Sequence, residues 1–288
     1  MQRTWRQVSI AVGLAACLLG GIALAEDAET SFARVSTDDE GRPQALQIAV
    51  ATYVPQDPSR HFSVDLVGAV HIGDKKYYAE LNDRFRGYDA VLYELVAPQG
   101  TIVIPEGSER KGILSNSQLG LTRMLGLSFQ LDEIDYAQSN FVHADLSAQE
   151  LSQSMDERGE SLYVYFWRIF YATIDEYAKD PLGMRDWQAL TAILKNAESP
   201  TLKTIVAYEL TNLDSVSDIL GEDSDSAVIG ARNERAIEVL RNRLDSGDTR
   251  LGIFYGIGHM PDLEQRLLDM GLVRHETNWV DAWRLSGD

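Results

Sequence analysis

The chain has 288 residues, of which 44% are hydrophobic and 24% are charged. This length and apolar fraction suit one large packed domain or two small ones, and they exclude a wholly disordered or low-complexity protein. The 44 acidic side chains outnumber the 26 basic ones and give a formal net charge of -18. Because such a surface repels phosphate backbones, we expect no nucleic acid partner.

The first 25 residues are expected to be an export signal. Two arginines precede an apolar and small-residue run over 8–25, which ends in the Ala-Leu-Ala pattern that signal peptidase reads. We expect cleavage after Ala25, a periplasmic or secreted protein, and membrane association only through this N-terminal segment. Two alternatives stay open, a lipoprotein attached at Cys17 and an uncleaved membrane anchor.

Cleavage at this point changes the charge and the cysteine content. Because the segment carries two arginines and no acidic residue, its removal takes the net charge from -18 to -20. It also removes Cys17, the only cysteine of the chain. The exported domain is therefore expected to lack disulfides and to depend on its core or on bound ions.

The rest of the chain predicts a single α/β domain over 45–288, after an irregular lead-in at 26–44. The expected fold has a mixed central sheet, βαβ units at both ends of the chain and a large helical insert over about 113–245. Strands are expected at 45–54, 61–72, 90–96, 251–255 and 272–285, and helices outside the insert at 74–86 and 262–270. Between them we expect a loop at 98–112, an irregular or short strand crossing at 133–145, and helices at 116–128, 147–158, 159–179, 183–197, 199–220 and 227–244.

The helix expected at 159–179 is unusual because it carries seven aromatic residues. A helix that is apolar on all sides is typical of a protein core. The alternative is a substrate groove or a dimer face.

A short unit occurs twice in the sequence. Apolar strands end in the tetrapeptides 68–71 and 256–259, both of which read Gly-x-x-His. We expect each glycine to allow a tight backbone, and an aspartate three residues after each histidine to cap the next helix. His71 and His259 would then stand at the carboxyl edge of the sheet, where ligands bind in open parallel sheets. If the two strands are neighbours, the two imidazoles converge.

Glu94 interrupts the apolar strand at 90–96 near its carboxyl end. A carboxylate there is costly to bury without a cation or hydrogen-bond donors. Two histidines and one carboxylate are a common ligand set for a catalytic divalent ion with an open position for water. We therefore predict that His71, His259 and Glu94 bind a metal. Zinc fits this set, and manganese, cobalt or iron would fit with added oxygen ligands.

Other polar residues are weaker candidates. Arg232, just before an amphipathic helix, is either a surface charge or a group that binds a substrate carbonyl or oxyanion. His143 and Asp145 could add a ligand or a substrate contact, although a helix cap adequately explains Asp145. His61 and His275 are interpreted as structural.

The order of these motifs resembles the TraB/PrgY/GumN family and its animal relatives, the TIKI metalloproteases. The resemblance covers roughly 62–272 and rests on the two Gly-x-x-His motifs, Glu94 and the pair Arg232-Asn233. It implies an α/β fold of the wider TIKI and erythromycin-esterase-like group. The segment 45–72 departs from the Leu/Trp-rich lead of the family, which affects the substrate expectation more than the metal site.

The resemblance also implies that the two histidines and Glu94 form a metal-dependent hydrolytic centre, with Arg232 matching a family arginine. We therefore expect an exported metal-dependent hydrolase that acts on a peptide or another small amide. Glu94 is either the third ligand or the general base, and Arg232 would stabilise the developing oxyanion.

Two alternative functions stay open. One is a non-catalytic exported protein of the same fold that binds or sequesters a peptide, and the other is a small-molecule esterase. The chain has no Gly-x-Ser-x-Gly motif, and its one cysteine lies in the expected signal. Serine and cysteine nucleophile mechanisms therefore have little support.

Overall fold

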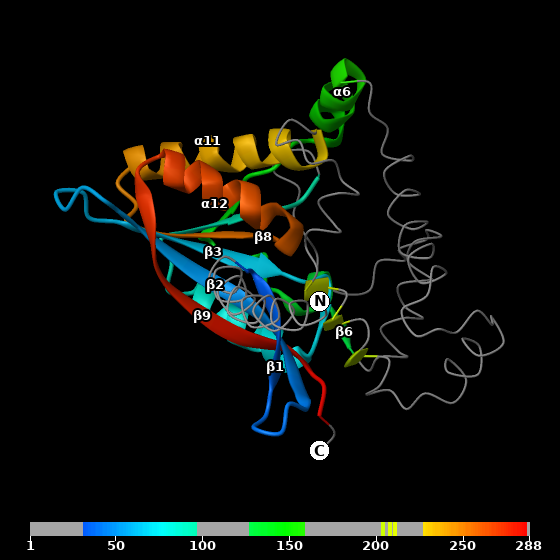
Figure 1. The fold of residues 1–288 in the computed structure, drawn as a ribbon. Helices are drawn as coiled ribbons and strands as arrows, with labels where there is room; N and C mark the ends of the chain where they lie inside the picture. Colours follow the sequence, from blue (N-terminus) through cyan, green and yellow to red (C-terminus); the bar gives the residue numbers. More distant parts are fainter. Residues whose placement is uncertain are drawn as a thin grey trace, which may run out of the picture. The chain divides into compact units, whose positions relative to one another are not determined.

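The computed structural model describes residues 31–96, 127–158, 203–204, 207–208, 210–211 and 227–286. A seven-stranded mixed sheet lies at its centre (Figure 1). Its strands are β1 (Ala33–Thr37), β2 (Pro43–Pro55), β3 (Ser63–Ala69), β5 (Ala90–Tyr93), β7 (Phe141–His143), β8 (Arg250–Gly256) and β9 (Leu272–Arg284). Two short segments, β4 (Ile72–Gly73) and β6 (Ser128–Phe129), form a separate antiparallel pair.

Four neighbouring strands of the sheet are parallel, in the order β3-β8-β5-β7. On the other side of β3 the sheet becomes antiparallel, because β2 pairs with β1, β3 and β9 in that orientation. The placement of β8 is decisive for the site. This late strand lies between β3 and β5, with Leu251 opposite both Val64 and Ala90. β3, β5 and the much later β8 therefore end at the same edge of the sheet.

Helices cover both faces of this sheet, which suits parallel strands that are apolar on both sides. The helices are α3 (Lys75–Phe85), α5 (Gln130–Glu133), α6 (Ala148–Arg158), α11 (Arg232–Asp245) and α12 (Met260–Asp269), with a π-helical turn η1 (Ala227–Ala231) and a 3-10 turn η2 (Ile257–His259). Figure 1 shows α11 and α12 side by side across the strands. Leu66 and Ile253 pack in the core with these two helices, whereas Val67 and Phe254 pack in the core that contains α3.

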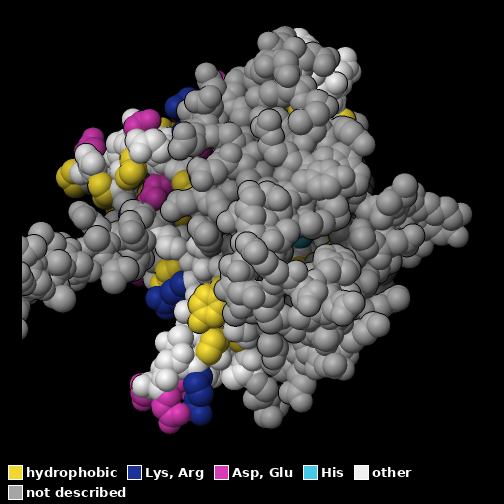
Figure 2. Space-filling model, turned by 45° about the vertical axis from the view of Figure 1, so that its right-hand side comes forward, with side chains coloured by type: hydrophobic (Ala, Val, Ile, Leu, Met, Phe, Trp, Pro, Cys, Tyr) yellow, Lys and Arg dark blue, Asp and Glu magenta, His cyan; other side chains and the backbone are white. Residues whose placement is uncertain are grey.

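The described surface carries charges of both signs. On the face drawn in Figure 2, acidic and basic side chains lie next to each other. In the turn between β1 and β2, for example, Arg42 pairs with Asp38 and Glu40. Exposed pairs of this kind contribute little to stability. Among the described residues, no helix combines the length and the apolar character that a membrane span requires.

The α/β class, the mixed sheet and the five expected strands are confirmed, with ends that differ by a few residues. The expected helices at 74–86, 147–158 and 262–270 are α3, α6 and α12, and the one at 227–244 is η1 followed by α11. The two expected βαβ units are β3-α3-β5 and β8-α12-β9. Neither unit joins adjacent strands, because β8 separates β3 from β5 and two strands separate β8 from β9.

One expectation about the irregular segments is wrong. The lead-in at 26–44 is not irregular where it is described, because 33–37 forms β1 and the neighbouring Phe32 is fully buried. Within the insert at 113–245, the short strand crossing expected at 133–145 is confirmed, because β7 lies there and extends the central sheet beside β5. The short strand β6 was not expected. A strand of two residues is too short to produce a recognisable period.

Several expectations fall on residues outside the described part of the chain. These are the export signal at 1–25, the loop at 98–112 and the helices at 159–179, which includes the aromatic cluster, and 183–197. Of the helix expected at 116–128, only Leu127 and Ser128 are described, and Ser128 belongs to β6. The described residues within 199–220 are helical.

Candidate functional site

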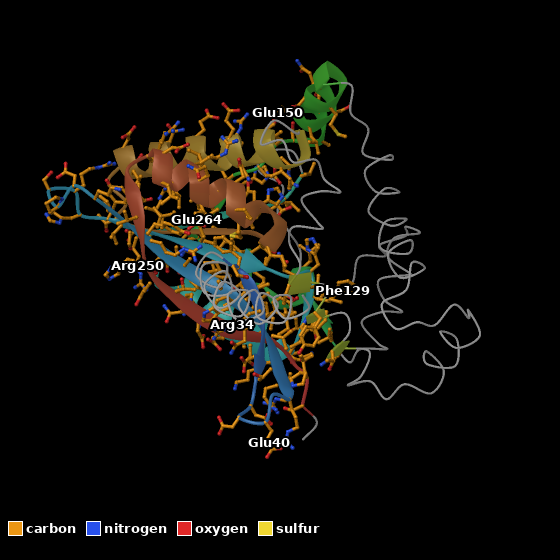
Figure 3. All side chains as sticks on the ribbon, viewed as in Figure 1. Arg34, Glu40, Phe129, Glu150, Arg250 and Glu264 are labelled. Atoms are coloured by element: carbon orange, nitrogen blue, oxygen red, sulfur yellow. The ribbon has the colours of Figure 1, made fainter. Side chains whose placement is uncertain are left out.

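The predicted site residues lie just after three parallel strands, at one edge of the sheet. β3 leads to His71, β8 leads through η2 to His259, and Glu94 directly follows β5. Because β8 pairs with β3, the prediction that the two Gly-x-x-His strands are neighbours is confirmed. Figure 3 shows Phe129 of β6 beyond the ends of the parallel strands, and Arg250, the first residue of β8, at the opposite edge.

The carboxylate of Glu94 is held by hydrogen bonds on both oxygens. Oε2 accepts the backbone N–H of Gly256 at 2.8 Å, and Oε1 accepts an N–H of Arg232 Nη2 at 2.7 Å. Burial raises the pKa of Glu94, but the charge that His259 carries in acid, the charge of Arg232, the Gly256 hydrogen bond and the charge of His71 outweigh it and lower the pKa to about 2. Glu94 is therefore ionised at any physiological pH.

Arg232 is the first residue of α11 and joins two carboxylates. Its Nε and Nη2 donate to the two carboxylate oxygens of Asp145, at 2.9 and 2.6 Å, while Nη2 also donates to Glu94. The side chain of Asp145 is fully buried and that of Arg232 is 9% exposed. Burial lowers the pKa of Arg232, but its hydrogen bonds and charge interactions with Asp145 and Glu94 raise the pKa by more than burial lowers it. The net shift is therefore upward. The interpretation of Arg232 as a surface charge is therefore wrong.

The explanation of Asp145 as a helix cap is also wrong. The cap of α6 is instead a reciprocal pair between Ser147 and Glu150. Ser147 Oγ accepts the backbone N–H of Glu150 at 3.2 Å, and Glu150 Oε2 accepts that of Ser147 at 2.8 Å. Asp145 is thereby left to hold Arg232, and it accepts the backbone N–H of Leu146 as well.

His259 ends η2 and is buried, with 6% of its surface exposed. Burial lowers its pKa to about 4, so its imidazole is neutral at pH 7. Nε2 lies 3.7 Å from Oε1 of Glu94 and 3.4 Å from Nη1 of Arg232. On the opposite side of the ring, Nδ1 lies 2.7 Å from Oδ1 of Asn233. In the sequence analysis Asn233 appears only as the neighbour of Arg232, and its contact with His259 was not predicted. Its position at the start of an amphipathic helix was the one feature that could have indicated a role in the site.

His71 differs from its counterpart because its side chain is exposed. Its backbone carbonyl accepts the N–H of Gln130, and its charge is close enough to lower the pKa of Glu94. Among the described residues, no three His, Cys, Asp or Glu side chains are grouped closely enough to hold a metal ion. The structure thus brings Glu94 and His259 together, with His71 at the same edge but outside their immediate contact.

The three remaining histidines have other surroundings. Nε2 of His143 lies 2.6 Å from the carbonyl oxygen of Leu95, so it donates its proton there and holds the backbone just after Glu94. His61 and His275 are exposed.

The two glycines that begin the repeated motif differ in how closely neighbouring side chains approach them. A Cβ on Gly68 would lie 2.8 Å from Cγ2 of Ile48 and 3.2 Å from Cγ2 of Ile257, so the close approach of these side chains requires glycine. At Gly256 the nearest atom would be Oε2 of Glu94 at 3.4 Å, an ordinary contact, and the backbone φ is -52°. Neither glycine has a positive φ, so the tight backbone expected at both is not seen at either, and Gly68 is required by side-chain packing instead.

Neither aspartate of the repeated motif caps a helix with its side chain. Asp74 occupies the N-cap position of α3, but its carboxylate accepts the backbone N–H of Arg284 at 2.6 Å and fixes β9 instead. Asp262 lies inside the first turn of α12, where it accepts hydrogen bonds from Asn233 and Arg266.

Comparisons of the chain with protein-family models, with curated proteins and with solved structures find no match. The resemblance to the TraB/PrgY/GumN family therefore stays a prediction from the motifs.

Proposed function

We propose that this protein is an exported metal-dependent hydrolase of the TraB/PrgY/GumN kind, with its site at the edge where β3, β8 and β5 end. The observation that carries the proposal is the distance of 3.7 Å between Nε2 of His259 and Oε1 of Glu94. Two ligands that each lie about 2.0–2.2 Å from one ion can have this separation. A neutral imidazole and an ionised carboxylate are also the protonation states that metal binding needs.

The charge balance around Arg232 supports a bound cation. Two carboxylates, Glu94 and Asp145, share this single guanidinium, and His259 is neutral at pH 7. The cluster therefore has one unbalanced negative charge in a largely buried place. An additional cation at Glu94 and His259 would neutralise this charge, which is otherwise costly to bury.

The ligand set fits a divalent ion such as zinc, manganese or cobalt. His259 and Glu94 would hold the ion, and the exposed His71 would supply the third ligand from the neighbouring strand. An ion at this place would polarise a substrate carbonyl and lower the pKa of a water molecule. Because a carboxylate with a pKa of about 2 is a weak base, Glu94 suits the role of ligand better than that of general base.

The hydrogen bonds of Arg232 limit what it contributes to the reaction. Nε and Nη2 are committed to the two carboxylates, whereas Nη1 faces His259 at 3.4 Å. Nη1 is therefore the group that would donate to a developing oxyanion. The rest of the guanidinium positions Glu94. The substrate class, a peptide or another amide, comes from the family resemblance, and a small ester is the alternative.

A second candidate, a hydrolase without a metal, is favoured by the contact between Arg232 Nη1 and His259 Nε2. In that arrangement His259 would take the proton from water and Arg232 would bind the oxyanion. Its pKa of about 4 makes His259 a weak base, which is why we place this candidate second.

Hydrolysis assays with controlled metal content test the proposal. Purified protein is stripped with a chelator and assayed on fluorogenic peptides and on p-nitrophenyl esters, with and without Zn²⁺, Mn²⁺ or Co²⁺. We expect an added ion to restore hydrolysis and Glu94→Gln to reduce kcat/KM by roughly 100-fold or more. Glu238→Gln, an exposed change on α11, is the matched control and should keep full activity.

The alternatives give different results in the same assay. Activity that survives chelation but is lost in His259→Gln would support the metal-free hydrolase instead. Stoichiometric peptide binding without hydrolysis under every metal condition would contradict both enzymatic candidates and favour a binding protein.

A further inference from the structure

The side chain of Asn233 lies between His259 and Asp262 and contacts both. Asn233 is the second residue of α11 and is fully buried. Its Nδ2 donates to the backbone carbonyl of His259 at 3.2 Å and to Oδ2 of Asp262 at 2.7 Å. Its Oδ1 lies 2.7 Å from Nδ1 of His259. One amide thus holds both the backbone and the ring of the same histidine.

These partners determine which way the amide points. A carbonyl oxygen and a carboxylate oxygen only accept hydrogen bonds, so the group that faces them must be the NH₂. A flipped amide would place Oδ1 against two oxygens and lose both bonds. With the amide oriented in this way, Oδ1 faces Nδ1 of His259 and can only accept its proton.

The orientation of the amide decides the tautomer of the imidazole. In a neutral histidine one ring nitrogen has the proton and the other has a lone pair. Because Nδ1 must donate to Asn233, the lone pair of His259 is on Nε2, the nitrogen that faces Glu94 and Arg232.

The opposite tautomer has a competing partner in the same site. If the proton were on Nε2, the carboxylate of Glu94, 3.7 Å away, would attract it, and the lone pair needed for metal binding would be lost. Nη1 of Arg232, which only donates hydrogen bonds, faces the same nitrogen at 3.4 Å and favours a lone pair there. Asn233 and Arg232 therefore both oppose the preference that Glu94 would impose on the ring.

Asp262 and Arg266 fix the position of the Asn233 amide through further hydrogen bonds. Oδ2 of Asp262 accepts from Arg266 Nε at 2.7 Å, and Arg266 Nη2 donates to the carbonyl of Gly230 at 3.3 Å. These contacts join the first turn of α12 to the turn that precedes α11. The chain of hydrogen bonds from Arg266 to His259 is continuous.

We infer that Asn233 is a positioning residue that keeps the proton of His259 on Nδ1 and so leaves the Nε2 lone pair facing the site. The inference rests on the proposed function for what Nε2 binds, but the tautomer itself does not depend on it. Loss of such a partner typically weakens metal binding by 10–100-fold.

Nitrogen NMR of histidine in the metal-free protein at neutral pH tests the tautomer directly. In the wild type we expect the His259 ring, assigned by loss of its signals in His259→Gln, to show a protonated Nδ1 and a bare Nε2. Asn233→Ala should shift the proton toward Nε2, and Asn233→Leu, which preserves volume, gives a second reading if the alanine variant does not fold.

Asn140→Ala is the matched control for these variants. Asn140 also uses its amide to bind two backbone carbonyls, those of Phe85 and Tyr88, but it lies before β7 and away from His259. This control should leave the His259 signals unchanged. A protonated Nδ1 and bare Nε2 in a folded Asn233→Ala or Asn233→Leu variant would overturn the inference, as would a wild-type ring protonated on Nε2.

Titration of the same metal-free proteins with Zn²⁺ separates this inference from the proposed function. We expect a Kd that is 10–100-fold weaker in Asn233→Ala than in the wild type, and unchanged in Asn140→Ala. Equal Kd values in wild type and Asn233→Ala would overturn the positioning role even if the wild type is a metal-dependent enzyme. A wild type that binds no ion but shows the Asn233-dependent tautomer would contradict the proposed function and leave the tautomer result standing.

Discussion

Arg232 is the residue on which the stability of the candidate site depends most. It pairs with Glu94 and Asp145, and all three side chains are largely or fully removed from water. Taking one partner out of a buried ion pair leaves a charge without compensation, and the cost usually exceeds that of any exposed pair. Here two carboxylates would lose their common partner at once.

Replacement of Arg232 by methionine should therefore strongly destabilise the fold. We expect Arg232→Met to lower the free energy of unfolding by about 3–5 kcal/mol, measured by urea denaturation at pH 7. Arg235→Met, on the same helix, is the control, because Arg235 pairs with the 43%-exposed side chain of Glu150. That change should cost less than about 1 kcal/mol. Equal costs for the two variants would show that the buried pairs do not hold the site together.

Buried, neutral His259 predicts a loss of stability in mild acid. Its pKa falls from 6.5 to about 4 because burial opposes the charged ring, whereas the unfolded chain takes up the proton near pH 6.5. The unfolded state therefore binds more protons as the pH falls, and the free energy of unfolding should drop by about 2 kcal/mol from pH 7.5 to pH 5. Urea denaturation across this range measures the slope.

His259→Gln is the control for this pH dependence, because glutamine takes up no proton in either state. The variant should be less stable at pH 7.5 but should show a flatter dependence between pH 6.5 and pH 5. Glu94, with a pKa of about 2, adds its own loss only at lower pH, as the unfolded carboxylate begins to protonate near pH 4.5. The same slope in wild type and His259→Gln would assign the effect to other groups.

At the scale of elements, the two Gly-x-x-His segments are alike in sequence and unlike in structure. The first ends in an exposed bend at His71, whereas the second winds into η2 and buries His259. The repeated spacing correctly located two strand ends, because glycine and a following polar residue commonly end a buried strand. It could not show the burial of each histidine, which depends on α11 and Asn233 from another part of the chain.

The same contrast predicts different tolerance to alanine at the two glycines. Gly68→Ala would push a Cβ against Ile48 and Ile257, and we expect a cost of about 1–3 kcal/mol in thermal or urea unfolding. Gly256→Ala meets only an ordinary contact with Glu94 and should cost less than Gly68→Ala. A larger loss at Gly256 than at Gly68 would contradict this account of the close approach between β3 and its neighbours.

Long, regular elements were predictable from the sequence, and short ones were not. The 13-residue strands β2 and β9 and the amphipathic helix α3 have enough residues to show a period. The three residues of β7 do not, so the sequence indicated only an irregular or short strand crossing at 133–145 and not that this strand extends the sheet. The Asp145-Arg232 pair was missed for this reason, since an aspartate before a helix has a simpler local explanation as a cap.

At the scale of the whole molecule, the site exists because of strand order. β8, which begins at Arg250, lies between β3 and β5 and brings His259 beside Glu94. The sequence predicted the three strand ends and only the condition that two of the strands be neighbours. It could not fix the order, because that order depends on packing between segments more than 150 residues apart.

The most direct test of the central claim is the metal content of the purified wild-type protein and of His259→Gln, measured by elemental analysis after exchange into a metal-free buffer. The proposed site predicts about one tightly bound divalent ion per wild-type chain and its loss in the variant. No stoichiometric ion in the wild type, or the same content in both proteins, would contradict a metal centre at His259 and Glu94.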